Sequence, residues 1–456
     1  MNTFIYGGSD KLLIKKLEEN LNIRCKIHSI EGLEKDYSNL ELIRDNFYKV
    51  PFLDTDARKI YQSFFRENFT QFNSMIVRRG LFLSDFHDLR DEFSVYYHSF
   101  FEILKKKRIE LIIFFSFPHE GPDYILYKLA KHLKIKTLLF YQSIFKNRFF
   151  VISDLNEFGK IKKEDNNREN SKLLLNDDNS YINHINNYNL ENSKKSESFL
   201  LNLKKSRRKI RFVLLKILNF LKIIKRRNHQ KEYLNNLGKI QINDEKLNKL
   251  LNNGKKKIYF PLHFQPELTT SLLGENFDDQ ILIIERLSQF AGENYEIIVK
   301  ENPRQTFYQR GEFFFKRLKF FKNVYFANKF FNSNELIKKT DITATVCGTP
   351  GWEAIKNGKK TLLFGKSWFS GIHGCLKIGD HTTDEEIKKF IEQEFDKSTF
   401  DKDFNNLMGQ SYKGLIDFDY KNILKLKNFD EHKNATEIKN IILEILNVKQ
   451  IKNEKN

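Results

Sequence analysis

Short, continuous apolar runs, each followed by a stretch with helical periodicity, occur in two separate parts of the chain and limit its fold most strongly. In the first part, apolar runs at 110–116 and 137–142 flank a predicted helix at 122–133, and a further strand is predicted at 2–6. Apolar runs without polar alternation are typical of a parallel sheet that is buried on both faces. Strand, helix and strand in this order form a βαβ unit, so we expect a parallel sheet here.

The same alternation returns in the second part of the chain. The predicted strands are 257–262, 295–300, 342–347 and 361–364. The predicted helices are 279–290, 333–339 with Ser333 as its N-cap, and 352–356. We therefore predict an α/β protein with two Rossmann-like domains, a doubly wound fold in which ligands bind beyond the carboxyl ends of the strands.

Composition divides the 456 residues further. The segment 156–198 is rich in Asn, Lys, Asp, Glu and Ser, a composition too poor in apolar residues to form a core. The predicted regions are an N-terminal Rossmann-like domain (1–154), an Asn/Lys-rich insert (155–250), a C-terminal Rossmann-like domain (251–400) and a C-terminal helical tail (401–456).

Positive charge is concentrated in one segment. The chain carries 78 Lys and Arg against 59 Asp and Glu, a net charge of +19, and eleven of the basic residues lie within 204–227, which has no acidic residue. Its apolar residues gather on one side of a helix, as in interfacial helices on anionic membranes. The alternatives are a helix packed on the protein with a basic outer face, and RNA binding. The basic residues are Lys204, Lys205, Arg207, Arg208, Lys209, Arg211, Lys216, Lys222, Lys225, Arg226 and Arg227.

Several classes of protein are excluded or disfavoured. Three cysteines are too few for a disulfide scaffold or a four-cysteine zinc module. Asp-x-Asp triplets occur at 54–56, 401–403 and 417–419, but none follows a clear buried strand, so we predict no metal site. The chain does not open on a basic leader with an apolar core, and no apolar run reaches the roughly 18 residues that span a bilayer. We expect a cytoplasmic protein that is peripheral to a membrane.

The segment 347–354, with the sequence CGTPGWEA, lies where an apolar strand passes into a helix. Gly348 and Gly351 allow a tight turn and a close approach of a ligand to the backbone. The free N–H groups at the start of the helix favour a phosphate group. Glu353 could accept hydrogen bonds from ribose hydroxyls, although a plain strand–turn–helix with a solvated Glu353 is an equal alternative.

Two further polar segments follow predicted strands. His263, Gln265 and Glu267 alternate in 259–270 and would share one face of an extended segment. Lys300 and Arg304 leave the end of a buried strand at a proline, where they could pair with a diphosphate or a carboxylate. For both segments, an ordinary surface loop is the alternative.

Three titratable residues follow the apolar run 110–116 in the first part of the chain. They are His119, Glu120 and Asp123. Any of the three could act as a general base near neutral pH if it is partly buried. For Asp123, the alternative is a capping role in the first turn of the helix.

These motifs together resemble the capsule polysaccharide biosynthesis family. The resemblance rests on YFPLHFQPELTTSLLG, VKENPRQ and TVCGTPGWEAIKNGKKTLLFG in this order, with FPHEGPDYILYKLAKHLKIKTLLFYQ fitting the first half, and covers roughly 109–154 and 255–375. The family is similar to the GT-B glycosyltransferases of bacterial surface polysaccharides, including the Kdo transferases of Gram-negative capsules. It implies two Rossmann-like domains facing a cleft, with the nucleotide-sugar donor in the C-terminal domain and the acceptor and base in the N-terminal domain.

The resemblance also implies site residues. The phosphate turn corresponds to Thr349 and Gly351, the ribose-binding acid to Glu353, the basic strand-end cluster to Lys300 and Arg304, and the loop facing the cleft to His263 and Gln265. The family often has a histidine before the proline of its K-E-x-P segment. This chain has Asn302 there, which can form hydrogen bonds but cannot titrate.

We therefore expect a metal-independent glycosyltransferase without a bound cofactor. It would transfer a sugar from a nucleotide-sugar, CMP-linked donors being one candidate, to a growing capsular or lipopolysaccharide-type glycan at the inner face of the cytoplasmic membrane. The basic cluster and the helix end would stabilise the leaving phosphate, and His119, Glu120 or Asp123 would deprotonate the acceptor. The alternatives are a GT-B-like nucleotide-sugar epimerase or glycerophosphotransferase, and a non-catalytic protein that binds nucleic acid or acts as a scaffold.

Overall fold

A computed structural model describes residues 1–8, 10–28, 34–37, 55–76, 86–161, 227–417, 420 and 429–454. They form two compact units. Unit 1 comprises Met1–His184 and Phe404–Asn456, and unit 2 comprises Ile185–Asp403. Of the predicted basic amphipathic segment 204–227, only Arg227 lies within the described residues.

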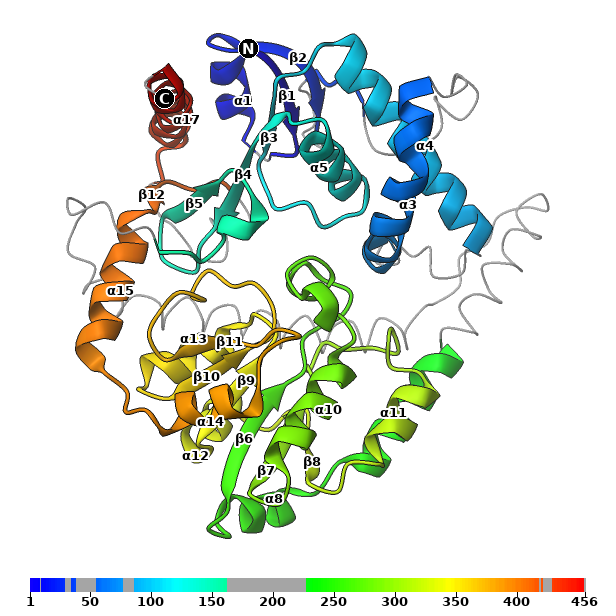
Figure 1. The fold of residues 1–456 in the computed structure, drawn as a ribbon, viewed down its shortest axis with the longest axis vertical. Helices are drawn as coiled ribbons and strands as arrows, with labels where there is room; N and C mark the ends of the chain where they lie inside the picture. The colour runs from blue at the N-terminus through cyan, green and yellow to red at the C-terminus, as the bar shows by residue number, and fades with distance from the viewer. Residues whose placement is uncertain are drawn as a thin grey trace, which may run out of the picture. The chain divides into compact units, whose positions relative to one another are not determined.

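Unit 1 is built on a six-stranded sheet (Figure 1). Its order is β12 (Tyr412–Lys413), β5 (Arg148–Ile152), β4 (Lys136–Gln142), β3 (Leu111–Phe114), β1 (Asn2–Tyr6) and β2 (Asn22–Ile27). β1 to β4 pair in parallel, whereas β5 and β12 add antiparallel strands at one side. The parallel sheet that the apolar runs predict is therefore confirmed.

Helices cover both faces of this sheet. They are α1 (Lys11–Glu18), α3 (Thr55–Ile76), α4 (Phe86–Lys106), α5 (Pro122–His132) and α17 (Glu431–Glu454), with a short 3-10 turn at Leu155–Glu157. Alternate strand residues such as Ile5 and Ile113 pack with α1 and α17. Phe114, which points to the other face, packs against Tyr127 of α5.

The segment 401–456, treated as a helical tail in the sequence analysis, extends the first unit. From Phe404 onward it belongs to unit 1. Tyr412 and Lys413 pair with β5, and Ala435, Ile438 and Ile442 of α17 enter the same core as α1. The C-terminal residues thus complete the N-terminal fold.

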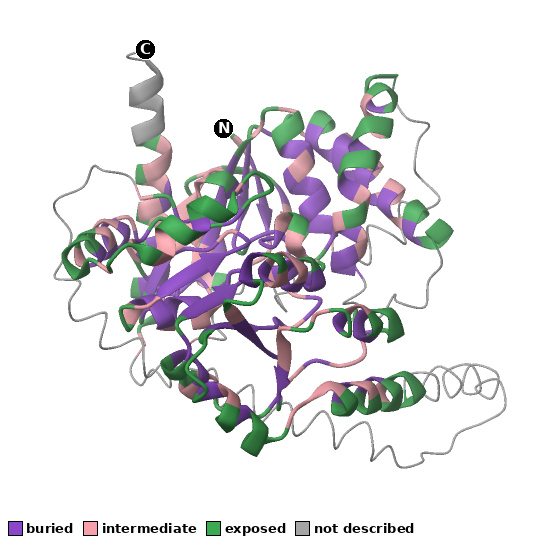
Figure 2. Ribbon diagram, turned by 60° about the horizontal axis from the view of Figure 1, so that its bottom comes forward, coloured by how far each residue is buried: buried purple, intermediate pink, exposed green. Residues whose placement is uncertain are grey.

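Unit 2 contains a second six-stranded sheet, in which every pair is parallel. Its order is β11 (Cys375–Lys377), β10 (Lys360–Leu363), β9 (Ile342–Thr345), β6 (Lys256–Pro261), β7 (Tyr295–Lys300) and β8 (Val324–Ala327). Buried residues concentrate in the strands, and exposed residues lie on the outer sides of the helices (Figure 2).

The helices predicted at 279–290, 333–339 and 352–356 are present as α10 (Gln280–Ala291), α12 (Ser333–Lys339) and α13 (Thr349–Lys356). The further helices of unit 2 are α8 (Asp244–Leu251), α9 (Leu268–Ser271), α11 (Glu312–Leu318), α14 (Asp384–Glu392) and a helix at 227–240, with a 3-10 turn at Glu275–Phe277. The chain passes from unit 2 to unit 1 within α15 (Lys397–Gly409). The predicted N-cap of α12 is wrong by one residue. Asn332 is the cap, because its side chain accepts from the Asn334 N–H, and Ser333 instead accepts from the Tyr259 hydroxyl at 3.3 Å.

Each sheet has one point where the strand order reverses. In unit 1, β1 lies between β2 and β3, and in unit 2, β6 lies between β7 and β9. Ligands of doubly wound sheets bind beyond the carboxyl ends of the strands at such points. No helix in the described ranges is both long and apolar enough to cross a bilayer.

Candidate functional site

The loops after β6 and β9 meet at the reversal point of unit 2. His263 follows β6, and its Nε2 lies 2.9 Å from the hydroxyl of Thr345, the last residue of β9. The same hydroxyl accepts from the Gly348 N–H at 3.1 Å. A Cβ atom on Gly348 would lie 2.7 Å from Cε1 of His263, so this approach requires glycine. Two motifs that are far apart in the sequence thus form one site.

His263 is a rigidly held, neutral group. Its backbone N–H donates to Gln280 Oε1 at 2.7 Å, and Gln280 Nε2 donates back to the His263 carbonyl at 3.1 Å. Burial lowers the pKa of the imidazole to about 4. His263 is therefore uncharged at neutral pH and can position a ligand by hydrogen bonding, but it adds no positive charge.

The amino end of α13 has no side-chain cap. Gly348 occupies its N-cap position and Thr349 begins the helix. Pro350 has no N–H and the Gly351 N–H donates to the Gly348 carbonyl at 3.1 Å, so among the first three helical residues only the Thr349 N–H is left for an anion.

The helix ends of unit 1 are of both kinds. Asp10 caps α1 by accepting from the N–H groups of Leu12 and Leu13 at 2.9 and 3.0 Å. The helix α5, which follows β3 as α13 follows β9, begins after Gly121 and has no side-chain cap either. A helix end without a side-chain cap therefore occurs in both units.

Gly351 has a packing role in α13. A Cβ atom there would lie 2.7 Å from Thr345 Cγ2 and 3.0 Å from Thr361 Cγ2. Glycine thus lets the helix lie directly on β9 and β10. The sequence motif predicts a turn around this residue, whereas the structure places it inside the first turns of the helix.

Glu353 lies further along α13 on the side of Tyr259. Burial raises the pKa of the Tyr259 hydroxyl, the hydrogen bond with Ser333 opposes this rise, and the nearby Glu353 carboxylate adds to it. Glu353 is half-buried. This carboxylate is therefore held next to β6 and α12, within unit 2.

The loop after β7 is built around a buried ion pair that the sequence analysis missed. Arg310 Nε donates to Glu301 Oε2 at 2.8 Å, and the two side chains are 1% and 0% exposed. Arg310 Nη1 also donates to Gln265 Oε1 at 2.7 Å, and Gln265 Nε2 donates to the Asp278 carbonyl. The Gln265 side chain is thus used to hold the loops together. No local pattern distinguishes these residues from exposed polar ones, because their pairing is decided by the fold.

Gln305 completes the connection between the two loops. It accepts from the Gln265 N–H at 2.8 Å and donates to the Gln265 carbonyl at 3.2 Å. Glu267, the third member of the alternating set, is the half-buried N-cap residue of α9 and makes no capping bond with its side chain. His263, Gln265 and Glu267 therefore have separate roles and do not present one common face to a ligand.

Lys300 and Arg304 lie at the start of this loop. Lys300 is 5% exposed, and its ammonium donates to the Lys329 carbonyl at 3.3 Å. Burial lowers the pKa of Lys300 to about 8, although Glu301 opposes the shift. Within the described part of the chain, no carboxylate lies within 4 Å of this ammonium. The Arg304 guanidinium lies 4.7 Å from the ring centre of Phe264, in the loop after β6.

Of the predicted general-base candidates in unit 1, His119 and Glu120 lie in the loop between β3 and α5, and Asp123 lies in the first turn of α5. Asp123 is buried, and its carboxylate accepts from the N–H groups of His119 and Glu120, both at 2.8 Å. Burial raises the pKa of this carboxyl. Asp123 therefore fixes the loop before α5 and does not cap the helix, whose N-cap residue is Gly121, whereas Glu120 is exposed and His119 is half-buried.

The hydrogen bond of His119 defines its tautomer. Nδ1 lies 2.6 Å from the Phe117 carbonyl oxygen. Because a carbonyl only accepts, Nδ1 carries the proton, and Nε2 of the neutral ring presents its lone pair. This arrangement suits a general base.

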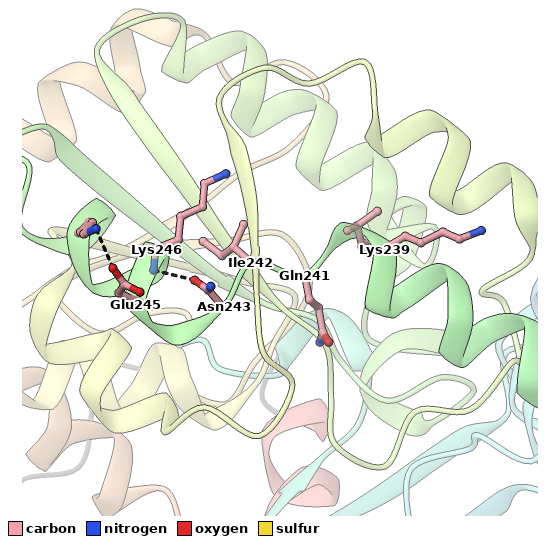
Figure 3. Close-up of a pocket in the computed structure, with 8 residues that line it drawn as sticks. Lys239, Gln241, Ile242, Asn243, Glu245 and Lys246 are labelled. Atoms are coloured by element: carbon pink, nitrogen blue, oxygen red, sulfur yellow. Dashed lines mark hydrogen bonds and ion pairs between the residues drawn. The ribbon is translucent and has the colours of Figure 1, made fainter.

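A hollow of about 540 Å³ lies elsewhere in unit 2, lined by residues 239–249 (Figure 3). It adjoins the edge strand β8, where Ile242 N–H donates to the Phe326 carbonyl, two strands away from β6. Lys239 and Lys246 point in different directions in Figure 3, and Lys249 pairs with Glu245 at 2.7 Å. None of the predicted site residues lines this hollow.

No group of three or more His, Cys, Asp or Glu residues in the described ranges is placed to hold a metal ion. The Asp-x-Asp triplet at 54–56 begins outside the described residues. Cys347 donates to the Thr269 carbonyl at 3.0 Å, and burial raises the pKa of its thiol, so it is a structural residue.

The comparison with protein families confirms the resemblance over part of the chain. Residues 219–411 match the model described as "Capsule polysaccharide biosynthesis protein". This range includes the loops after β6, β7 and β9 that build the site. No curated protein matches the sequence.

Several solved structures are similar at low identity. The beta Kdo 2,7 transferase of Thermosulfurimonas dismutans KpsC is 11% identical over 75% of this chain and 89% of that chain, with a TM-score of 0.31. The Methanocaldococcus jannaschii UDP-GlcNAc 2-epimerase in complex with UDP-GlcNAc and UDP is 12% identical over 90% and 97%, with a TM-score of 0.29. A Burkholderia vietnamiensis alpha,alpha-trehalose-phosphate synthase is 9% identical over 90% and 95%, with a TM-score of 0.30. Scores this low carry no argument about function.

Proposed function

We propose that this chain, whose residues 219–411 match the capsule polysaccharide biosynthesis family, is a glycosyltransferase that extends a surface glycan from a nucleotide-sugar donor. One observation carries the assignment of the donor to unit 2. The amino end of α13, which has no side-chain cap, lies against His263 at the reversal point of the sheet.

In this proposal, the residues of unit 2 bind and polarise the donor. The amino end of α13, Lys300 and Arg304 would stabilise negative charge on the leaving phosphate without a metal ion. His263 would donate or accept a hydrogen bond as a neutral group, because its pKa is about 4. Glu353 would bind the ribose hydroxyls.

In unit 1, His119 would remove the proton of the acceptor hydroxyl through Nε2, since Nδ1 is occupied by the Phe117 carbonyl. Asp123 would hold the loop that carries His119. The basic segment 204–227 would attach the enzyme to the anionic inner face of the cytoplasmic membrane, where the acceptor is a glycan or glycolipid.

A nucleotide panel tests the donor assignment. We expect one of CMP, UDP, GDP or CDP to raise the thermal midpoint, and Glu353→Ala to weaken its binding severalfold in calorimetry, because a charge-assisted hydrogen bond is lost. Glu335→Ala, at a half-buried carboxylate of α12 paired with Lys339, is the matched control and should bind the nucleotide normally. If no nucleotide binds, the enzyme proposal fails; sugar products formed without an acceptor would instead indicate an epimerase.

Lys300→Met should weaken nucleotide binding by about 10- to 100-fold at pH 7, the value of one charge-assisted hydrogen bond. The unliganded variant should nevertheless have a higher thermal midpoint, because burial disfavours the ammonium and lowers its pKa to about 8. In the wild type, the affinity for the nucleotide should fall as the pH rises above about 8, because Lys300 then loses its proton. This pH dependence should be absent from Lys300→Met. Equal affinity of both proteins between pH 7 and 9, measured by calorimetry, would remove Lys300 from the site.

A further inference from the structure

Two strongly exposed phenylalanines lie on the outward side of α11 and the turn that follows it. Phe313 is 75% exposed and Phe320 is 81% exposed. Phe313 and Lys316 lie one helical turn apart in α11, and Phe320 lies two residues beyond the end of the helix. On the inner side, Phe314, Phe315 and Leu318 are buried. The element is therefore firmly packed, and the exposed rings are a feature of its outer surface.

The same segment is rich in positive charge. Residues 312–322 contain four basic residues and one acidic residue. The Lys316 ammonium lies 5.3 Å from the ring centre of Phe313 and pairs with Glu312 at 2.8 Å. Lys319 and Lys322 are exposed, and in the described ranges neither has a carboxylate within 4 Å. Aromatic rings and lysine ammonium groups thus share one surface.

The helix that carries this surface packs against the helix 227–240 on its inner side, with ring centres of Tyr233 and Phe315 6.1 Å apart. Figure 1 labels α11 at the outer edge of unit 2. Along the chain, this helix directly follows the segment 204–226, which contains ten basic residues and no acidic one.

We propose that the α11 face, consisting of Phe313, Lys316, Lys319, Phe320 and Lys322, docks unit 2 on an anionic lipid bilayer. Phenylalanine side chains gain free energy on entering the interface, and lysines near the surface are attracted to anionic lipid. A second copy of the chain is a poorer occupant, because a two-fold contact would place the lysines of this face opposite one another. The proposal does not depend on the enzymatic function or on the nucleotide site.

The test uses the full chain and vesicles of phosphatidylcholine alone or mixed equally with phosphatidylglycerol. Phe313→Ser/Phe320→Ser should reduce binding to the anionic vesicles about tenfold or more, since two rings no longer enter the interface. Phe86→Ser, at a 57% exposed position of α4 in unit 1, is the matched control and should bind like the wild type. Nucleotide affinity should be the same in all three proteins.

A local probe keeps the test independent of the segment 204–227. The native tryptophans, Trp352 and Trp368, are buried, so the emission of Phe313→Trp should shift to the blue on anionic vesicles, whereas that of Phe86→Trp should not. An unshifted Phe313→Trp spectrum on vesicles that bind the protein would overturn the proposal. A double-serine variant that binds vesicles normally but loses self-association would assign the face to a second copy instead.

Discussion

Arg310→Met is expected to destabilise unit 2 by about 3–5 kcal/mol, because it leaves the Glu301 carboxylate buried without its partner. The two side chains are 1% and 0% exposed, and the Arg310 guanidinium also holds the Gln265 side chain at 2.7 Å. The midpoint of urea unfolding, followed by tryptophan emission, measures the effect, since both tryptophans lie in unit 2.

The chain offers a matched control for this substitution. Arg317 pairs with Asp279 at 2.8 Å but is 42% exposed, so Arg317→Met should cost no more than about 1 kcal/mol. Replacing Glu301 together with Arg310 by apolar residues should recover part of the loss, because no unpaired charge then remains. Equal midpoints for the two single variants would show that the buried pair does not stabilise the loop after β7.

His119→Asn is expected to reduce the rate of sugar transfer by about 10²- to 10⁴-fold, the usual contribution of a general base. Asparagine can still donate a hydrogen bond to the Phe117 carbonyl in place of Nδ1, so the loop should keep its structure while the basic Nε2 is lost. Nucleotide affinity should not change, because this residue belongs to unit 1. The rate of sugar transfer in a single turnover measures the effect. Restoration of this rate by added imidazole would show independently that a base has been lost.

Glu120→Gln is the control for that experiment. Glu120 is exposed and adjacent in the chain, and its backbone N–H, like that of His119, is held by Asp123. We expect transfer within a few-fold of the wild type. The opposite result, a large loss in Glu120→Gln and little in His119→Asn, would make Glu120 the base.

The strand-end motifs were predictable because their position depends on local patterns. Buried strands appear in the sequence as apolar runs, and the carboxyl ends of parallel strands lie on the same edge of a sheet. From this, His263 after one strand and Gly348 after another are expected on one edge, and the structure brings them to within van der Waals distance. The individual roles were harder to predict. The sequence predicts that Gln265 faces a ligand. In the structure its side chain instead accepts a hydrogen bond from Arg310 and donates one to the Asp278 carbonyl.

The sequence by itself determined two α/β units with parallel strands and the loops that carry the candidate site, because buried strands and the turns between elements leave local patterns in the sequence. Only the tertiary structure decided that residues from Phe404 onward complete unit 1, that Arg310 pairs with Glu301, and that Asp10 caps one helix end while Gly348 leaves another without a side-chain cap. The first of these features depends on contacts between residues distant in the chain, and the second on a loop that brings Arg310 back to Glu301, nine positions earlier. The third depends on side-chain geometry, because Asp and Gly are both common N-cap residues and only the hydrogen bonds distinguish a capped helix end from an uncapped one.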